Sequence, residues 1–308
     1  MIGTQETLEA LSQFCFGGKV KKYKSCEELL DYIVLKGVIV NNRQDAIDKF
    51  QRYTYYSIIN TYKEVFKKDN KYITGVTFDE IYSLYEFDKN LRIIFLKYVL
   101  EIETIIKSLI ANMISQKYGI KKYLDERNCF DSNADIELIQ KLISNINEMI
   151  SKNYEKHQAV THYVKNYDFV PPFVLVKIMT LGQISRYYGL LKQTDRQAIS
   201  KYFKISDKIL KQILVNLTLV RNICAHNDRL YTFHSKFLIS PSLTNRTLRI
   251  KEKSTNLFML LNSMKYLLDA KNYYDFVNQI NNEINILSQK INCISINDIL
   301  KIMGFLSE

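Results

Sequence analysis

The chain has 308 residues, with 43 Lys and Arg against 32 Asp and Glu, so its formal net charge is +11. A surface this basic favours a polyanionic partner, with nucleic acid first and an anionic membrane second. Nine Gly and three Pro are too few for the turns of a β-sandwich or a doubly wound fold, so we expect an all-α protein. No basic leader and no run of about 18 apolar residues occurs, which predicts a cytoplasmic protein without a membrane span.

The side chains that usually bind metals are scattered. The five Cys stand at positions 15, 26, 129, 224 and 293 without a Cys-x-x-Cys pair, so neither a zinc site nor a disulfide framework is indicated. His157 and His162 are five positions apart, which does not match a four-residue metal pair on a helix. We therefore expect both to lie at the surface, and we expect no metal and no cofactor.

Residues 1–80 are predicted to form an N-terminal helical region. The Ser25-Cys-Glu-Glu28 stretch is a capping box that opens a helix ending near Gly37. Further helices follow from about 44 to 67, in a segment rich in Tyr. We expect these Tyr side chains to pack between helices, and we do not interpret the 22 Tyr of the chain as a stacking surface for bases.

Residues 81–235 are predicted to form the central helical domain. A capping box at Thr77 starts a helix through Tyr85, and a long helix with a wide apolar face then runs from about 91 to Lys117. Arg92 and Glu103 lie on this long helix, where a buried charge is costly unless it is paired. Either they form structural ion pairs or reach solvent, or they serve the site, with Glu103 orienting Arg221 or His226.

The rest of the chain continues the helical pattern. A polar helix is expected over about 135–165, Pro171 and Pro172 start another, and Gly182 is expected to allow close contact between helices. Thr194 is predicted to cap a short helix, and Ser206 to begin the next. Residues 236–308 are expected to hold a linker and helices near 255–270, 272–290 and 296–303.

The helix that begins near Ser206 ends in the chemically richest stretch of the chain, Arg221-Asn222-Ile-Cys-Ala-His226. Asn222, His226 and Arg229 are four and three residues apart, so they share one face. Arg221 is about 140° round the helix from His226, within reach of a common phosphate. Arg binds phosphate as a bidentate fork, and His exchanges protons near neutral pH. A His near a helix end is also a common capping or surface residue.

This stretch resembles the Arg-x(4–6)-His motif of the HEPN superfamily. Its continuation, Ala225-His226-Asn227-Asp228-Arg229-Leu230-Tyr231, is similar to the Abi-like (abortive infection, AbiD/AbiF) branch. The resemblance implies a multi-helix HEPN-like bundle with N-terminal and C-terminal helical extensions.

Other segments are similar to the same family. They are Leu35-Lys-Gly-Val-Ile-Val with 53–62, Phe87-Asp88-Lys-Asn-Leu91-Arg92 with Ile102-Glu103, and 172–188. Lys36 replaces an Arg of the family pattern, Thr54 and Ser57 depart from it, and Lys177 replaces an acidic residue.

The resemblance implies a metal-independent endoribonuclease of phage defence, a toxin controlled by an antitoxin or a small noncoding RNA. The catalytic residues are then Arg221, Asn222 and His226, and the supporting or RNA-binding residues are Glu103, Arg92, Arg229 and Asn227. Since one imidazole cannot easily be both acid and base, we expect a homodimer in which two motifs face each other. The alternative is a non-catalytic, RNA-binding HEPN-like helical module.

Overall fold

A computed structural model describes residues 23–240 and 254–306. The chain divides into two compact units, Met1–Ile81 and Tyr82–Glu308. The expected separation of residues 81–235 from 236–308 stays a prediction. The fold is all-α, as the scarcity of Gly and Pro predicts, with only two short antiparallel ladders in the described ranges.

The described part of the N-terminal unit consists of short helices and one hairpin. Its elements are α2 (Cys26–Leu35), α3 (Arg43–Tyr53), the π-helix η1 (Tyr56–Asn60), the 3₁₀-helix η2 (Lys63–Phe66), β1 (Lys67–Lys68) and β2 (Lys71–Tyr72). Its buried side chains include Leu30, Ile33, Phe50, Ile58 and Phe66. The ring of Phe50 meets that of Phe78 edge-on, at a centroid distance of 5.4 Å.

Both predicted capping boxes of this unit are present. Ser25 Oγ accepts a hydrogen bond from Glu28 N, and Glu28 Oε2 accepts one from Ser25 N. The helix that Ser25 opens ends at Leu35, and Gly37 follows with φ +97°. The Tyr prediction holds in part, because Tyr62 is buried whereas Tyr56 is 71% exposed.

The second capping box opens a helix much longer than expected. Thr77 and Glu80 cap each other, and α4 then runs without interruption over Phe78–Tyr118, 41 residues. The prediction of two helices, one ending at Tyr85, was wrong. Nothing between 85 and 91 is a Gly or a Pro, and the polar Asp88 in that stretch has a partner elsewhere in the fold.

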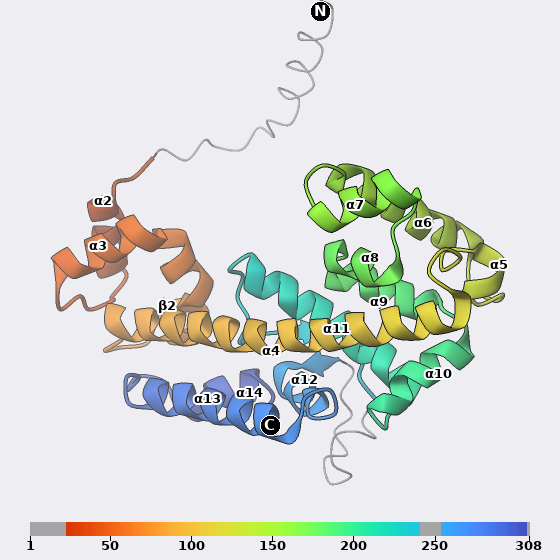
Figure 1. The fold of residues 1–308 in the computed structure, drawn as a ribbon. Helices are drawn as coiled ribbons and strands as arrows, with labels where there is room; N and C mark the ends of the chain where they lie inside the picture. The colour runs from red at the N-terminus through yellow and green to blue at the C-terminus, as the bar shows by residue number, and fades with distance from the viewer. Residues whose placement is uncertain (1–22, 241–253, 307–308) are drawn as a thin grey trace, which may run out of the picture. The chain divides into compact units, whose positions relative to one another are not determined.

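The C-terminal unit contains the remaining helices. They are α5 (Glu126–Cys129), α6 (Ile136–Asn153), α7 (Gln158–Tyr167), α8 (Pro172–Ile178), α9 (Leu181–Leu190), α10 (Gln193–Tyr202), α11 (Asp207–Ala225), α12 (Leu257–Met264), α13 (Ala270–Ser288) and α14 (Ile296–Ile302). The strands β3 (His234–Ser235) and β4 (Thr255–Asn256) pair His234 with Asn256. Within this unit, α8 and α9 lie on one side of α4, and the C-terminal helices α12–α14 lie on the other (Figure 1).

Contacts along α4 hold both groups of helices in this unit. On one side, Phe276 of α13 packs against the rings of Phe95 and Tyr98, at centroid distances of 5.0 Å and 4.7 Å. In the last turn of α4, Lys117 pairs with the buried carboxylate of Asp195 on α10. The long apolar face predicted for 91–117 is therefore the centre of this unit's core.

Two local predictions in the C-terminal unit were wrong. The expected helix over 135–165 is divided into α6 and α7, because Glu155 takes a left-handed conformation with φ +68° and His157 begins a new helix. Thr194 is not a cap, since α10 begins one residue earlier and Lys192 occupies its N-cap position. Ser206, by contrast, caps α11 as predicted, accepting a hydrogen bond from Ile209 N.

Across the two described ranges, no helix is both long enough and apolar enough to cross a bilayer. Helices α12 to α14 occupy the ranges expected near the C-terminus. Most of the predicted linker, residues 241–253, lies outside the described residues.

Candidate functional site

The motif stretch occupies the last turn of α11, and the way this helix ends determines where its polar residues lie. His226 is the C-cap, and Asn227 follows in the left-handed region with φ +58°. Asp228 N donates to Ile223 O at 3.0 Å, and Asn227 N donates to Cys224 O at 3.5 Å. These two bonds make a Schellman motif, in which Asn is one of the few side chains that tolerate this conformation. Asn227 therefore ends the helix, and its supporting or RNA-binding role stays a prediction.

The apolar stripe of α11 fixes the rotation of the motif. Leu210, Ile213, Leu217, Val220 and Cys224 are all buried, and Ile209 is half-buried. The opposite face carries Asn222 and His226, both exposed. We call this pair the motif face. The burial of one side of α11 thus presents the amide and the imidazole to solvent.

Arg221 lies beside the motif face and differs from it in burial. Its side chain is half-buried, and its Nε is buried with no hydrogen-bond partner in the described part of the chain. Neither Asn222 nor His226 has a side-chain hydrogen bond or ion pair with any described residue. A guanidinium, an amide and an imidazole are therefore uncommitted at one end of α11.

The backbone that follows the motif is held by a buried ion pair on α4. Asp88 is fully buried and pairs with Arg92, with Arg92 Nη1 and Asp88 Oδ2 separated by 2.6 Å. Leu230 N and Tyr231 N both donate to the Asp88 carboxylate, the latter at 2.6 Å. Arg92 Nη1 also donates to Asp228 O at 3.3 Å. Since carboxylates and guanidiniums make strong charge-assisted hydrogen bonds, this pair fixes residues 228–231 immediately beyond His226.

Glu103 forms an ion pair on its own helix, which is one of the two alternatives that the sequence leaves open. Its Oε1 accepts from Lys107 Nζ at 2.6 Å, and its Oε2 is buried with no hydrogen-bond partner among the described residues. No hydrogen bond joins Glu103 to Arg221 or His226 within those residues. The orienting role of Glu103 stays a prediction.

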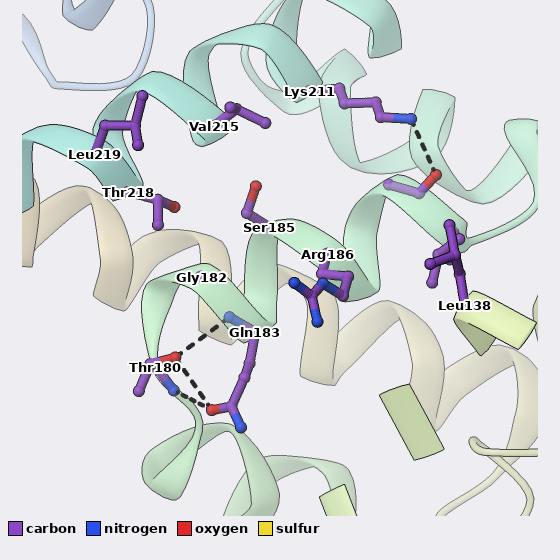
Figure 2. A pocket seen from close by; sticks show the side chains of 12 residues that line it. Leu138, Thr180, Gly182, Gln183, Ser185, Arg186, Lys211, Val215, Thr218 and Leu219 are labelled. Carbon is purple, nitrogen blue, oxygen red and sulfur yellow. Dashed lines mark hydrogen bonds between the residues drawn. The ribbon is translucent and has the colours of Figure 1, made fainter. Parts of the chain in front are cut away.

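A groove of about 560 Å³ lies between α9 and α11 (Figure 2). Lys211, Val215 and Thr218 line it from α11, at steps of four and three residues. The same steps continue to Asn222 and His226, so the groove opens along the helix face that ends in the motif face. His226 is eight residues beyond Thr218, a rise of about 12 Å.

On the α9 side of this groove, Gly182 lies close to α11, and Arg186 provides a positive charge. A Cβ on Gly182 would lie 3.2 Å from Thr218 Cγ2, so glycine allows the two helices to approach closely, as predicted. Arg186 lines the groove, is exposed, and has no hydrogen bond or ion pair with described residues. Lys211 Nζ donates to Gly189 O at 3.4 Å. The groove therefore combines small and apolar walls with two positive charges.

The thiol inside the motif is not reactive. Cys224 is buried, and burial raises its pKa to about 12, with nearby Asp88 raising it further and Arg92 opposing the shift. A thiol protonated at neutral pH cannot serve as a nucleophile. In the described ranges, no group of three or more His, Cys, Asp and Glu side chains is placed to hold a metal ion.

A comparison with protein families identifies a match. A family model described as Abi-like protein matches residues 48–232, more than half of the chain, from α3 to the residue after Tyr231. The chain belongs to the Abi-like protein family. The HEPN superfamily is consistent with this family, and membership supports a role in abortive infection. No curated protein and no solved structure matches the chain.

In this Abi-like chain, the motif residues fall into two groups. Arg221, Asn222 and His226 come together at the end of α11, whereas Arg92 and Asn227 hold the backbone around them. Arg229 is exposed, with its guanidinium 6.0 Å from the ring centre of Tyr231.

Reasoning from the sequence did not include Asp88 among the site residues of the Abi-like chain. The available signal was an acidic residue four positions before Arg92 on the same helix. Arg186 and Lys211 were also missed, because nothing in their local sequence marks them as neighbours across a groove.

Proposed function

We propose that this Abi-like protein is a metal-independent endoribonuclease. The observation that carries the proposal is the arrangement at the end of α11, where Arg221, Asn222 and His226 adjoin one another without partners in the described chain. Polar groups held by a rigid helix end and not committed to the fold are available to a substrate. Their chemical types match the needs of phosphodiester cleavage.

The reaction uses the nucleophile that RNA itself carries. The 2′-OH loses its proton to a base and attacks the adjacent phosphorus, and the P–O5′ bond then breaks as the leaving oxygen takes up a proton. The products are a 2′,3′-cyclic phosphate and a 5′-hydroxyl. His226 moves a proton, and Arg221 binds the charged phosphorane through its bidentate fork. Asn222, four residues from His226, orients the phosphate or the imidazole.

The α9–α11 groove supports the choice of substrate. Its lining cations, Arg186 and Lys211, lie on the approach to the motif face, where they suit the phosphates of a strand that continues past the scissile bond. The net charge of +11 adds a general attraction for a polyanion. A single strand fits better than a duplex, because the attacking 2′-OH must align with its own phosphate.

A second copy of the chain completes the proposed site. The step requires both a base and an acid, and each motif has one imidazole. Among the other histidines, His157 and His162 belong to α7 and its cap, while His234 Nδ1 lies 3.0 Å from Thr232 O. We propose a two-fold dimer in which both His226 side chains face one phosphate. As a toxin in abortive infection, such an enzyme requires restraint by an antitoxin or a small noncoding RNA.

The nuclease proposal is tested with a His226→Ala variant and a His234→Ala control, each incubated with end-labelled single-stranded RNA in EDTA. Both histidines are exposed, so neither change disturbs the core. We expect His226→Ala to lose cleavage and His234→Ala to retain it. If a folded His226→Ala chain cleaved RNA at the wild-type rate, the nuclease proposal would be wrong.

The dimer is tested by mixing. Wild-type chains are diluted with excess His226→Ala chains at constant total concentration. If both imidazoles are needed, activity falls as the square of the wild-type fraction, because mixed dimers are inactive. A linear dependence would contradict the shared site.

One observation favours the alternative of a non-catalytic RNA-binding module. The His226 imidazole has no partner among the described residues to fix its orientation, which a catalytic imidazole usually requires. Tight RNA binding without cleavage by the wild-type dimer would support this alternative.

A further inference from the structure

A second concentration of positive charge lies in the N-terminal unit, in a cavity of about 420 Å³. The end of α2 and the β1–β2 hairpin contribute to its lining. This volume is within the range of small-ligand sites in proteins. We call it the Tyr–Lys cavity, after the side chains that dominate its lining. It belongs to this unit alone, and the nuclease proposal makes no use of it.

Four lysines line the Tyr–Lys cavity: Lys36, Lys63, Lys67 and Lys71. No carboxylate is among the lining residues, and the neighbouring Glu64 pairs with Lys67 at 3.2 Å. The ammonium groups of Lys36 and Lys71 have neither a hydrogen bond nor an ion pair with described residues. Four like charges with a single neighbouring carboxylate repel one another, so such an arrangement favours an anionic ligand.

Three tyrosines form the remaining distinctive part of the lining: Tyr32, Tyr55 and Tyr72. None of their hydroxyl groups has a hydrogen-bond partner within the described residues. Burial raises the pKa of Tyr72, so its hydroxyl stays protonated and can donate. One side of Tyr55 rests edge-on against Phe50, at a centroid distance of 5.4 Å, which fixes its ring.

The combination identifies the ligand class. Inorganic phosphate alone would need cations and donors but no aromatic rings. A nucleoside alone would need rings but no cluster of ammonium groups. A nucleotide uses both, because its base stacks on aromatic faces while its phosphate binds cations. An ammonium group also lies over the Tyr32 ring, with Lys36 Nζ at 5.6 Å from the ring centre, so cation and ring are adjacent.

We propose that the Tyr–Lys cavity binds a nucleotide, with the phosphate at Lys36 and Lys71 and the base against the tyrosines. The nucleotide is either one residue of a single-stranded RNA or a free nucleoside phosphate, since both present the same chemistry. All residues that line the cavity belong to the N-terminal unit, and none of them belongs to the motif face.

The test measures binding of adenosine 5′-monophosphate by calorimetry, with adenosine and inorganic phosphate as partial ligands. All proteins carry His226→Ala, so that cleavage plays no part. The key variants are Lys36→Ala and Lys71→Ala. The matched control is Lys68→Ala, which removes the same charge from the register neighbour of Lys71 in the hairpin but does not line the cavity.

We expect the monophosphate to bind more tightly than either partial ligand. Lys36→Ala and Lys71→Ala should each weaken it about tenfold, and Lys68→Ala should leave it unchanged. Tyr32→Leu, at a residue 42% exposed, should weaken it about fivefold through lost stacking. Equal losses at Lys68 and Lys71, or phosphate binding as tightly as the monophosphate, would overturn the assignment, as would no binding at all.

The source of the nucleotide is decided by competition. A 12-residue 2′-O-methyl RNA lacks the nucleophile for cleavage and is added against bound monophosphate. If the oligonucleotide displaces the bound monophosphate at a lower concentration than unlabelled monophosphate does, an RNA strand is the ligand. Binding of the monophosphate without displacement by the oligonucleotide would identify a free nucleotide. In a second binding series, the slope of log affinity against log salt for the oligonucleotide should fall by about 0.7 in Lys71→Ala, one phosphate contact on a single strand.

Discussion

Replacing Asp88 by Asn tests whether the buried ion pair on α4 holds the backbone beyond the motif. The substitution keeps the shape of the side chain and removes its charge. Arg92, whose side chain is only 4% exposed, then loses its carboxylate partner. An amide offers one acceptor oxygen where the carboxylate offers two. Leu230 N and Tyr231 N both donate to Oδ1 of Asp88, whereas Arg92 Nη1 donates to Oδ2, so the amide nitrogen takes the place of one of these two acceptors.

The magnitude follows from these losses. Removing one charge of a buried ion pair costs about 3–5 kcal/mol, because the other charge stays buried without its counter-charge. At 1.4 kcal/mol for each factor of ten, the local opening of residues 228–231 should become at least a hundredfold more frequent. Hydrogen–deuterium exchange of the peptide covering those residues measures this opening, and RNA cleavage should fall with it.

The control for this experiment is Asp207→Asn. Asp207 is also buried, and its Oδ2 accepts from Arg196 Nε at 3.2 Å, but at the opposite end of α11. Exchange should increase around the start of α11 and stay unchanged at 228–231. The reasoning would be refuted if Asp88→Asn left exchange of 228–231 within threefold of wild type, or if Asp207→Asn accelerated it equally.

Further predictions concern Arg221, Cys224 and Gly304. Arg221→Lys should lose nearly as much RNA cleavage as Arg221→Ala, because an ammonium cannot replace the bidentate fork; recovery of activity by Lys would mean that charge alone suffices. In thiol labelling at pH 8 followed by mass spectrometry, Cys293 should react and Cys224, whose pKa burial raises to about 12, should stay protonated and unlabelled until the chain unfolds. Between the ordinary pKa of a thiol and about 12, the Cys224 thiol is deprotonated in the unfolded chain but still protonated in the folded one. Stability should therefore fall as the pH rises through this range, and the urea midpoint with it. The fall should be smaller in Cys224→Ala. Gly304→Ala should destabilise the chain by more than about 1 kcal/mol in urea unfolding, because φ is +81° and the new Cβ would lie 2.2 Å from the Asn256 amide; an unchanged midpoint would contradict the backbone argument.

The local features of the fold could be predicted from sequence, because they depend on residues three or four positions apart. The capping boxes at Ser25 and Thr77, the cap at Ser206 and the proline start at Pro172 are all present. The error over α4 arose where distant parts of the chain decide. The interruption expected after Tyr85 is absent because α4 continues across residues whose polar groups find partners elsewhere.

The candidate site divides in the same way. The face shared by Asn222 and His226 follows from helical spacing and the apolar stripe opposite. The backbone partners of Asp88, Leu230 N and Tyr231 N, are more than 140 positions away, so no local pattern could identify them. Glu103 lies on the long helix, as the sequence predicts, and its ion-pair partner is Lys107, four residues along the same helix.

The long sequence separation around Asp88 has a consequence during protein synthesis. Asp88 emerges from the ribosome well before Leu230, 142 positions later. At about 5–20 residues per second, this interval lasts roughly 7–30 s. Meanwhile Arg92, one helical turn away, can neutralise Asp88 on the nascent α4. The end of the motif helix therefore gains its support only when translation has passed Tyr231, so every shorter nascent chain lacks the assembled site.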